Sequence, residues 1–125
     1  MTEVGRKAAA RLAVTVMGSD AEAFAAAVGA DPGTGRLPST YPIRWLADTA
    51  VVALLRDLGA DKPDALPVHE MQTVEPLAPL PLDRPLTLAV IAERSDTIHI
   101  ELKAEITDTD GRLLARLHTL LRLMP

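Results

Sequence analysis

The sequence of 125 residues contains no cysteine, which excludes a disulfide framework and a zinc site with thiolate ligands. Aromatic residues are also scarce, with one Phe, one Tyr and one Trp, too few for a surface on which nucleic-acid bases stack. Lysine and arginine do not cluster, and the net charge is −4 at pH 7, whereas phosphate binding needs grouped cations. We therefore expect no nucleic-acid partner.

Long apolar runs are missing too, since no uninterrupted stretch approaches the roughly 20 residues that a membrane-spanning helix needs. The N-terminal apolar stretch is interrupted by Arg11 and is followed by no small-residue cleavage site, so it is not typical of a secretory signal. The length suits one core, and we expect a single domain over residues 1–125 in the cytoplasm, with no membrane association.

The longest periodic segment is Leu37–Gly59, in which apolar residues recur every three or four positions. That spacing places them on one face, so the segment predicts a single long helix. Pro42 fits its first turn, and Gly59 is expected to end it in a left-handed conformation. Trp45 and Val52 make the opposite face partly apolar, so we expect the helix to be buried on nearly all sides.

Shorter segments predict further elements on both sides of this helix. Alternating apolar residues favour strands at Arg11–Met17, Val68–Val74 and Leu86–Arg94. An S-x-x-E capping box at Ser19 favours a short helix from Asp20 to Val28. The remaining segments, rich in glycine or proline, are expected to be loops, namely Ala30–Thr40, Ala60–Pro67 and the crossover from Pro76 to Pro85.

The C-terminal third carries the firmest pattern, because apolar and polar residues alternate from Ile98 to Thr107. Asp110-Gly111 then predicts a two-residue type I′ turn, which would place Ala104 opposite Leu117. A slip of one residue would turn the apolar side chains to the wrong face, so turn and alternation support each other. The same register pairs Leu102 with Thr119, Ile100 with Leu121, Ile98 with Leu123 and Glu105 with Arg116.

The order of these elements predicts an α+β fold in which an antiparallel sheet curves around one long central helix. The last strand is expected to present Leu114, Leu120 and Met124 on its outer face. Apolar residues on a second sheet face are usually covered by a partner subunit, so we also expect a dimer.

Four segments together resemble a known family, the MaoC-like branch of the hot-dog fold. This branch contains (R)-specific enoyl-thioester hydratases and 3-hydroxyacyl-thioester dehydratases. Each motif is degenerate, and their common order and spacing over most of the chain carry the resemblance. The segments are AFAAAVGADP (Ala23–Pro32), LPSTYPIRW (Leu37–Trp45), VHEMQTVEPLAPLPLDRPLTLAV (Val68–Val90) and ITDTDGRLLARLHTLLR (Ile106–Arg122).

The resemblance implies an active-site loop of the form G-D-x-N-P-[IL]-H, whose Asp and His act as acid and base. This sequence departs from that pattern, because Ala30 follows Gly29 and no histidine follows Pro32. Asp31 and Pro32 correspond to the family's N-P pair. The resemblance therefore implies an acyl-thioester site without the family's dyad.

Three residues are candidates for chemistry. Asp31 is either a turn residue or a carboxylate beside the thioester, and His69 is either a polar residue at a strand start or a base. Asp48 either reaches solvent or pairs with Arg44, and the thioesterase branch of the fold can use an acid on this helix. The resemblance also places the acyl group at the start of the helix, near Thr40, Tyr41, Ile43 and Trp45.

The expected ligand is an acyl thioester carried by CoA or ACP, with no cofactor and no metal, since no histidine pair has metal-ligand spacing. The first hypothesis is a non-catalytic, substrate-holding subunit of a hydratase or dehydratase, in a homodimer or in a heterodimer with another hot-dog subunit. The second is an active homodimeric dehydratase or an acyl-CoA thioesterase. The third is a ligand-binding or scaffold protein without enzymatic activity.

Overall fold

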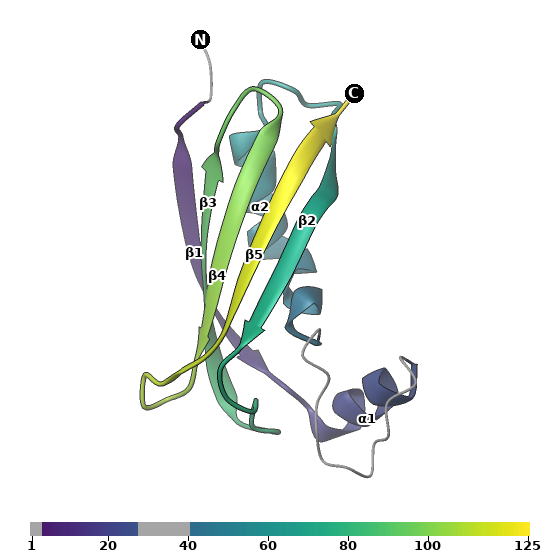
Figure 1. The fold of residues 1–125 in the computed structure, drawn as a ribbon, viewed down its shortest axis with the longest axis vertical. Helices are drawn as coiled ribbons and strands as arrows, with labels where there is room; N and C mark the ends of the chain where they lie inside the picture. The colour runs from purple at the N-terminus through teal and green to yellow at the C-terminus, as the bar shows by residue number, and fades with distance from the viewer. Residues whose placement is uncertain (1–3, 28–40) are drawn as a thin grey trace.

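The computed structural model describes residues 4–27 and 41–125. Five antiparallel strands form one sheet in the order β1-β3-β4-β5-β2, and the central helical segment crosses one face of it (Figure 1). The strands are β1 (Lys7–Thr15), β2 (Leu66–Pro76), β3 (Pro85–Arg94), β4 (His99–Thr107) and β5 (Leu113–Met124). The helices are α1 (Gly18–Ala27), the 3-10 helix η2 (Tyr41–Ala47) and α2 (Thr49–Leu58).

The predicted α+β arrangement is confirmed, but the edge strands are longer than expected. β1 begins at Lys7, before the predicted start at Arg11, because the alanines at its beginning give no visible alternation. Ala8 and Ala10 are nevertheless half-buried, and their neighbours are exposed. β2 extends two residues beyond the prediction at each end.

The register of the β4–β5 hairpin is confirmed, although its turn is of another type. The Gly111 N–H donates to the Asp108 carbonyl at 3.1 Å, and the Asp108 N–H donates to the Arg112 carbonyl at 3.0 Å. Gly111 alone in this turn has a positive φ, of 82°. This is a three-residue loop that ends in a left-handed glycine, not the predicted two-residue type I′ turn.

A β-bulge at Leu114 compensates for the longer turn. Ile106 pairs with Ala115 and Thr107 pairs with Leu113, so Leu114 has no partner in β4. The bulge turns the Leu114 side chain into the core, where it is only 3% exposed. The prediction that Leu114 lies on the outer face is therefore wrong, while Leu120 faces outward opposite Glu101 as expected.

The predicted helix from Leu37 to Gly59 is not continuous over its described part. Tyr41–Ala47 is a 3-10 helix, and Asp48 then takes an extended conformation with φ −59° and ψ 146°. The Asp48 carboxylate accepts a hydrogen bond from the Ala50 N–H at 2.9 Å, which makes it the N-cap of α2. Aspartate favours this position over a helix interior, so the chain starts a new helix there.

Gly59 ends α2, although not in the predicted left-handed conformation, since its φ is −102°. A Cβ atom at this position would lie 3.2 Å from the Leu55 carbonyl oxygen and close to Leu123. Glycine therefore suits the site because the backbone approaches its neighbours closely.

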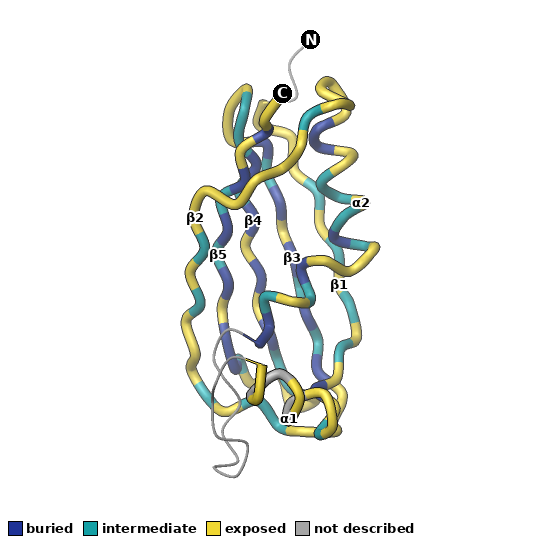
Figure 2. The backbone as a smooth tube through the Cα atoms, turned by 90° about the vertical axis from the view of Figure 1, so that its right-hand side faces the viewer, coloured by how far each residue is buried: buried dark blue, intermediate teal, exposed yellow. Residues whose placement is uncertain are grey.

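One face of α2 is exposed to solvent, contrary to the prediction of burial on nearly all sides. Val51 and Leu58 are fully buried, whereas Ala53, Arg56 and Asp57 are exposed. Figure 2 shows buried and exposed stretches following one another along α2. The helix packs chiefly against β1 and β3. It therefore covers one half of the inner sheet face and leaves the half formed by β5 and β2 less covered.

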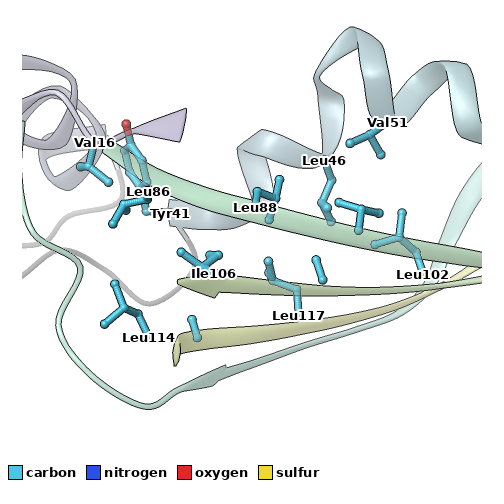
Figure 3. Packing of buried hydrophobic residues seen from close by; sticks show 13 residues of the cluster. Val16, Tyr41, Leu46, Val51, Leu86, Leu88, Leu102, Ile106, Leu114 and Leu117 are labelled. Atoms are coloured by element: carbon cyan, nitrogen blue, oxygen red, sulfur yellow. The ribbon is translucent and has the colours of Figure 1, made fainter. Parts of the chain in front are cut away.

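The main core lies between the helical segment and the inner sheet face (Figure 3). Tyr41 and Leu46 from η2 and Val51 from α2 pack onto inward-facing residues of β3, β4 and β5. A second cluster, around Leu58 and Ile100, fills the other end of the sheet.

Arg94 lies at the same end of the sheet as this second cluster and is only 1% exposed. Its guanidinium binds the Asp61 carboxylate, with Nη1 to Oδ1 at 2.6 Å, and donates to the Leu58 carbonyl at 2.8 Å. It also donates to the carbonyls of Asp96 and Thr97. Arg94 thus fastens the C-terminal end of α2 to the β3–β4 connection, and its hydrogen bonds hold the pKa of Asp61 below the ordinary value.

Candidate functional site

A groove runs between α2 and the edge strand β2, on the half of the inner sheet face that α2 leaves less covered. It consists of two cavities of about 180 Å³ and about 700 Å³. Leu55 from α2 and Pro67 from β2 line both of them, so they are neighbours. We call the two cavities together the α2–β2 groove.

Among the described residues, one titratable side chain lines the smaller cavity, that of His69 in β2. His69 pairs with Leu121, whose side chain faces inward, so His69 also points to the helix side of the sheet. Ile43 from η2 lies across the cavity wall, and Thr119 and Leu121 belong to the sheet beneath. The remaining lining residues are Leu46, Ala47, Leu55, Pro67 and Leu102.

The buried Thr119 and the half-buried Gln72 form a polar pair beside this cavity. Thr119 is only 1% exposed, and its hydroxyl donates a hydrogen bond to Gln72 Oε1 at 2.6 Å. Gln72 Nε2 donates to the His118 carbonyl at 3.3 Å. The pair is therefore satisfied within the protein and gives the apolar cavity one polar wall.

A β-bulge in β2 brings His69 and Gln72 to the same face. Residues three apart in a regular strand point to opposite faces, but the register shifts between His69 and Met71. Gln72 consequently pairs with the inward-facing Thr119, while Met71 pairs with the outward-facing Leu120. Sequence reasoning missed Thr119 and Gln72 as site residues, although the V-H-x-x-Q spacing in β2 contained the signal.

Of the predicted site residues that the structure describes, Ile43 and His69 line the groove. Tyr41 is 2% exposed and belongs to the main core, where its ring meets the edge of Trp45 at 5.7 Å between centroids. Trp45 packs against the same core. The binding roles of these residues stay predictions, and Asp31 and Thr40 lie outside the described residues.

Asp48 does not lie inside a buried helix, as the sequence suggested. It is exposed, caps α2, and is in neither lining of the groove. The cost of burying an unpaired carboxylate therefore does not arise at this position. A catalytic role for Asp48 stays a prediction.

A second group of titratable residues lies on the outer sheet face, away from the groove. His99 Nδ1 lies 2.8 Å from Asp96 Oδ2, and His99 Nε2 lies 2.5 Å from Glu70 Oε2. The hydrogen bond with Asp96, then that with Glu70, raises the pKa of His99 above 6.5. The Ile98 N–H and His99 in turn lower the pKa of Asp96. This group fastens the β2 bulge to β4 and lines neither cavity of the groove.

Over residues 4–27 and 41–125, no group of three His, Asp or Glu side chains is arranged to hold a metal ion. Within the same residues, no helix is both long and apolar enough to cross a membrane.

No family model matches the sequence, and no curated protein matches it. Solved structures do match the fold. The HadBC (3R-hydroxyacyl-ACP dehydratase) complex from Mycobacterium tuberculosis superposes with a TM-score of 0.67 and 15% identity, over 97% of each chain. A 1,4-dihydroxy-2-naphthoyl-CoA thioesterase from Synechocystis gives a TM-score of 0.66 and 16% identity, over 94% of this chain and 85% of that one.

A hot-dog-like protein from Thermanaerovibrio acidaminovorans also matches, with a TM-score of 0.61 and 18% identity, over 98% of this chain and 84% of that one. The sheet order, the helix across its inner face and these superpositions define the class. The chain has the hot-dog fold, as the sequence predicted.

Proposed function

We propose that this protein binds an acyl thioester, carried by CoA or by ACP, in the α2–β2 groove. The observation that carries the proposal is the pair of neighbouring cavities with mainly apolar linings on the less covered half of the sheet. The larger, of about 700 Å³, has the volume of a small-molecule site. Structural neighbours named for acyl-ACP and acyl-CoA reactions support this ligand class.

The role we propose is that of a substrate-holding, MaoC-like subunit without its own catalytic dyad. The loop sequence supports this role, because Ala30 stands after Gly29 and no histidine follows Pro32. In the part of the chain that the structure describes, His69 is the one titratable residue that lines the smaller cavity. Acid–base chemistry on a thioester needs both a proton acceptor and a proton donor, so a second subunit would have to supply them.

The edge strand β2 supports pairing with another hot-dog subunit, either a second copy or a different chain. β2 extends over 11 residues, and Leu66, Val68 and Met71 along it are 68%, 47% and 37% exposed. A long edge strand with exposed apolar side chains is a template for strand pairing. The groove lies directly beside this edge, so a paired subunit would border the ligand site.

One observation favours a second candidate, an active dehydratase or thioesterase. His69 points into the smaller cavity beside Ile43, where it could act as a general base on a bound thioester. Asp48, at the N-terminus of α2, would be the second group in that case. This candidate differs from the first in requiring turnover by the protein alone.

Ligand binding and turnover by the purified protein separate the candidates. We expect octanoyl-CoA to raise the melting temperature, with no turnover of crotonyl-CoA, 3-hydroxybutyryl-CoA or octanoyl-CoA. Hydratase activity should appear on co-expression with a hot-dog subunit that carries the dyad. Turnover by the protein alone, lost in His69→Gln but kept in the outer-face control His118→Gln, would establish the second candidate instead. If no thioester binds, both candidates fail and a scaffold role remains.

A further inference from the structure

The larger cavity of the α2–β2 groove combines an apolar wall with two cationic side chains. Val52 and Leu55 from α2 and Leu123 from β5 belong to its apolar wall. Among the described lining residues, the only side chains with polar atoms are those of Arg56 and Lys62. The part of this lining that belongs to residues 4–27 and 41–125 contains no acidic side chain and no uncharged polar one, although acidic residues outnumber basic ones in the whole chain.

The acids beside these two cations are already bound by other arginines. Asp57 follows Arg56 directly, and its carboxylate is held by Arg6 at 2.8 Å. Asp61 precedes Lys62, and its carboxylate is held by the buried Arg94 at 2.6 Å. Over the described residues, neither Arg56 nor Lys62 forms an ion pair, although each has an aspartate as its neighbour in sequence and the charge of Lys62 helps to lower the pKa of Asp61.

The position of Arg56 in the last turn of α2 accounts for part of its presence. A cation there interacts favourably with the helix dipole. That interaction uses no ion pair, so the guanidinium is still available to a ligand. Lys62 lies in the turn beyond the end of the helix, where its own backbone N–H donates to the Gly59 carbonyl.

We infer that Arg56 and Lys62 form an anion subsite at the mouth of the groove. It would take the phosphate or carboxylate end of an amphipathic ligand, while the apolar part lies along Leu55 towards His69. Leu55 lines both cavities, so the apolar path continues from one to the other. The inference rests on the proposed function and fixes the direction in which the carrier of the thioester enters.

The test compares three probes that share the octanoyl chain and differ in the group it is attached to, each titrated into the full chain by calorimetry in 50 mM NaCl. Octanoyl-CoA carries phosphates, octanoate carries a carboxylate, and S-octanoyl-N-acetylcysteamine is a neutral thioester. The variants are Arg56→Gln, Lys62→Gln and the double variant. The matched control is the double variant Arg84→Gln and Arg112→Gln, which removes the same charge from two exposed residues at the opposite end of the sheet.

For octanoyl-CoA we expect a loss of affinity of about threefold in each single variant and about tenfold in the double variant, as for exposed ion pairs. The neutral thioester should change less than about twofold, because it has no charge to lose. The losses should shrink at 300 mM NaCl, where screening is stronger. A parallel loss for octanoate would support the subsite and assign it to a carboxylate.

Two results would overturn the subsite while leaving the proposed function intact. One is neutral-thioester binding together with octanoyl-CoA affinity that is unchanged in the Arg56 and Lys62 double variant. The other is an equal loss of octanoyl-CoA affinity in the control. If neither thioester binds the wild-type chain, the proposed function itself fails, and the subsite with it.

Discussion

Replacing Arg94 by methionine should remove a large part of the stability of this protein. Arg94 is 1% exposed, and its guanidinium satisfies the Asp61 carboxylate and the carbonyls of Leu58, Asp96 and Thr97. Methionine fills much of the volume but leaves these acceptors without their donor. Removing one partner from a buried charge pair costs about 3–5 kcal/mol.

That loss should lower the melting temperature by roughly 10–20 °C for a domain of this length. It is a large fraction of the 5–15 kcal/mol or so that typically separates a folded domain from its unfolded chain. Arg94→Lys should fall between the wild type and Arg94→Met, because an ammonium group keeps the charge but cannot reach all the acceptors that a guanidinium fork reaches.

Urea unfolding followed by the fluorescence of Trp45, the single tryptophan, would measure the change. Protein concentration must be held fixed, since subunit pairing would add to the apparent stability. Arg122→Met is the matched control, because Arg122 is an exposed arginine of β5 and its loss should cost less than about 0.5 kcal/mol. An Arg94→Met variant within about 1 kcal/mol of wild type would show that the arginine does not fasten α2 to the sheet.

Three further predictions concern single residues. The raised pKa of His99 means that its bonds to Asp96 and Glu70 stabilise the fold fully below about pH 6.5 and less as the pH rises through the raised value. The stability difference between wild type and His99→Gln should therefore shrink on going from pH 6 to pH 9 in urea titrations, and a constant difference would contradict it. Gly111→Ala should cost about 1 kcal/mol, because the φ of 82° strains any other residue, and a neutral urea midpoint would contradict the turn type. Leu114→Ala should lower the free energy of unfolding by about 2–5 kcal/mol, as for a core leucine. Equally small losses for Leu114→Ala and Leu120→Ala would instead indicate that Leu114 lies on the outer face.

The C-terminal hairpin was predictable because two independent local signals agree there. The alternation from Ile98 to Thr107 fixes which face each side chain takes, and the glycine at 111 fixes where the chain reverses. The extra residue in the turn and the bulge at Leu114 shift the register in opposite directions. The predicted register was therefore correct although the predicted turn type was wrong. A bulge leaves no period-2 signature, and its location depends on packing that only the folded chain shows.

The division of the central helix had a local signal that competed with a longer one. Asp48-Thr49 is typical of a helix start, but the apolar period runs through it from Ile43 to Leu58. The period indicates which residues face the core and does not require one continuous helix. Both η2 and α2 follow it, with Leu46 and Val51 buried on either side of the break.

The candidate site was predictable only in part, because it depends on where α2 sits over the sheet. Ile43 and His69 are 26 positions apart, and nothing local shows that they line one cavity. The inward position of Gln72 depends on the β2 bulge. The free cations at Arg56 and Lys62 depend on Arg6 and Arg94, which reach their aspartates from distant parts of the chain.

The sheet order has a consequence for how the chain folds during synthesis. Both edge strands, β1 and β2, come from the first part of the chain, and neither pairs with the other. β1 pairs with β3 and β2 pairs with β5, so each must wait for a partner made later. Once β5 has been made, the local β3–β4–β5 meander can form quickly, while the long-range edge pairings close slowly. Until β5 has left the ribosome, the exposed apolar strand β2 has no place in the sheet, and this nascent stage is the one most open to aggregation.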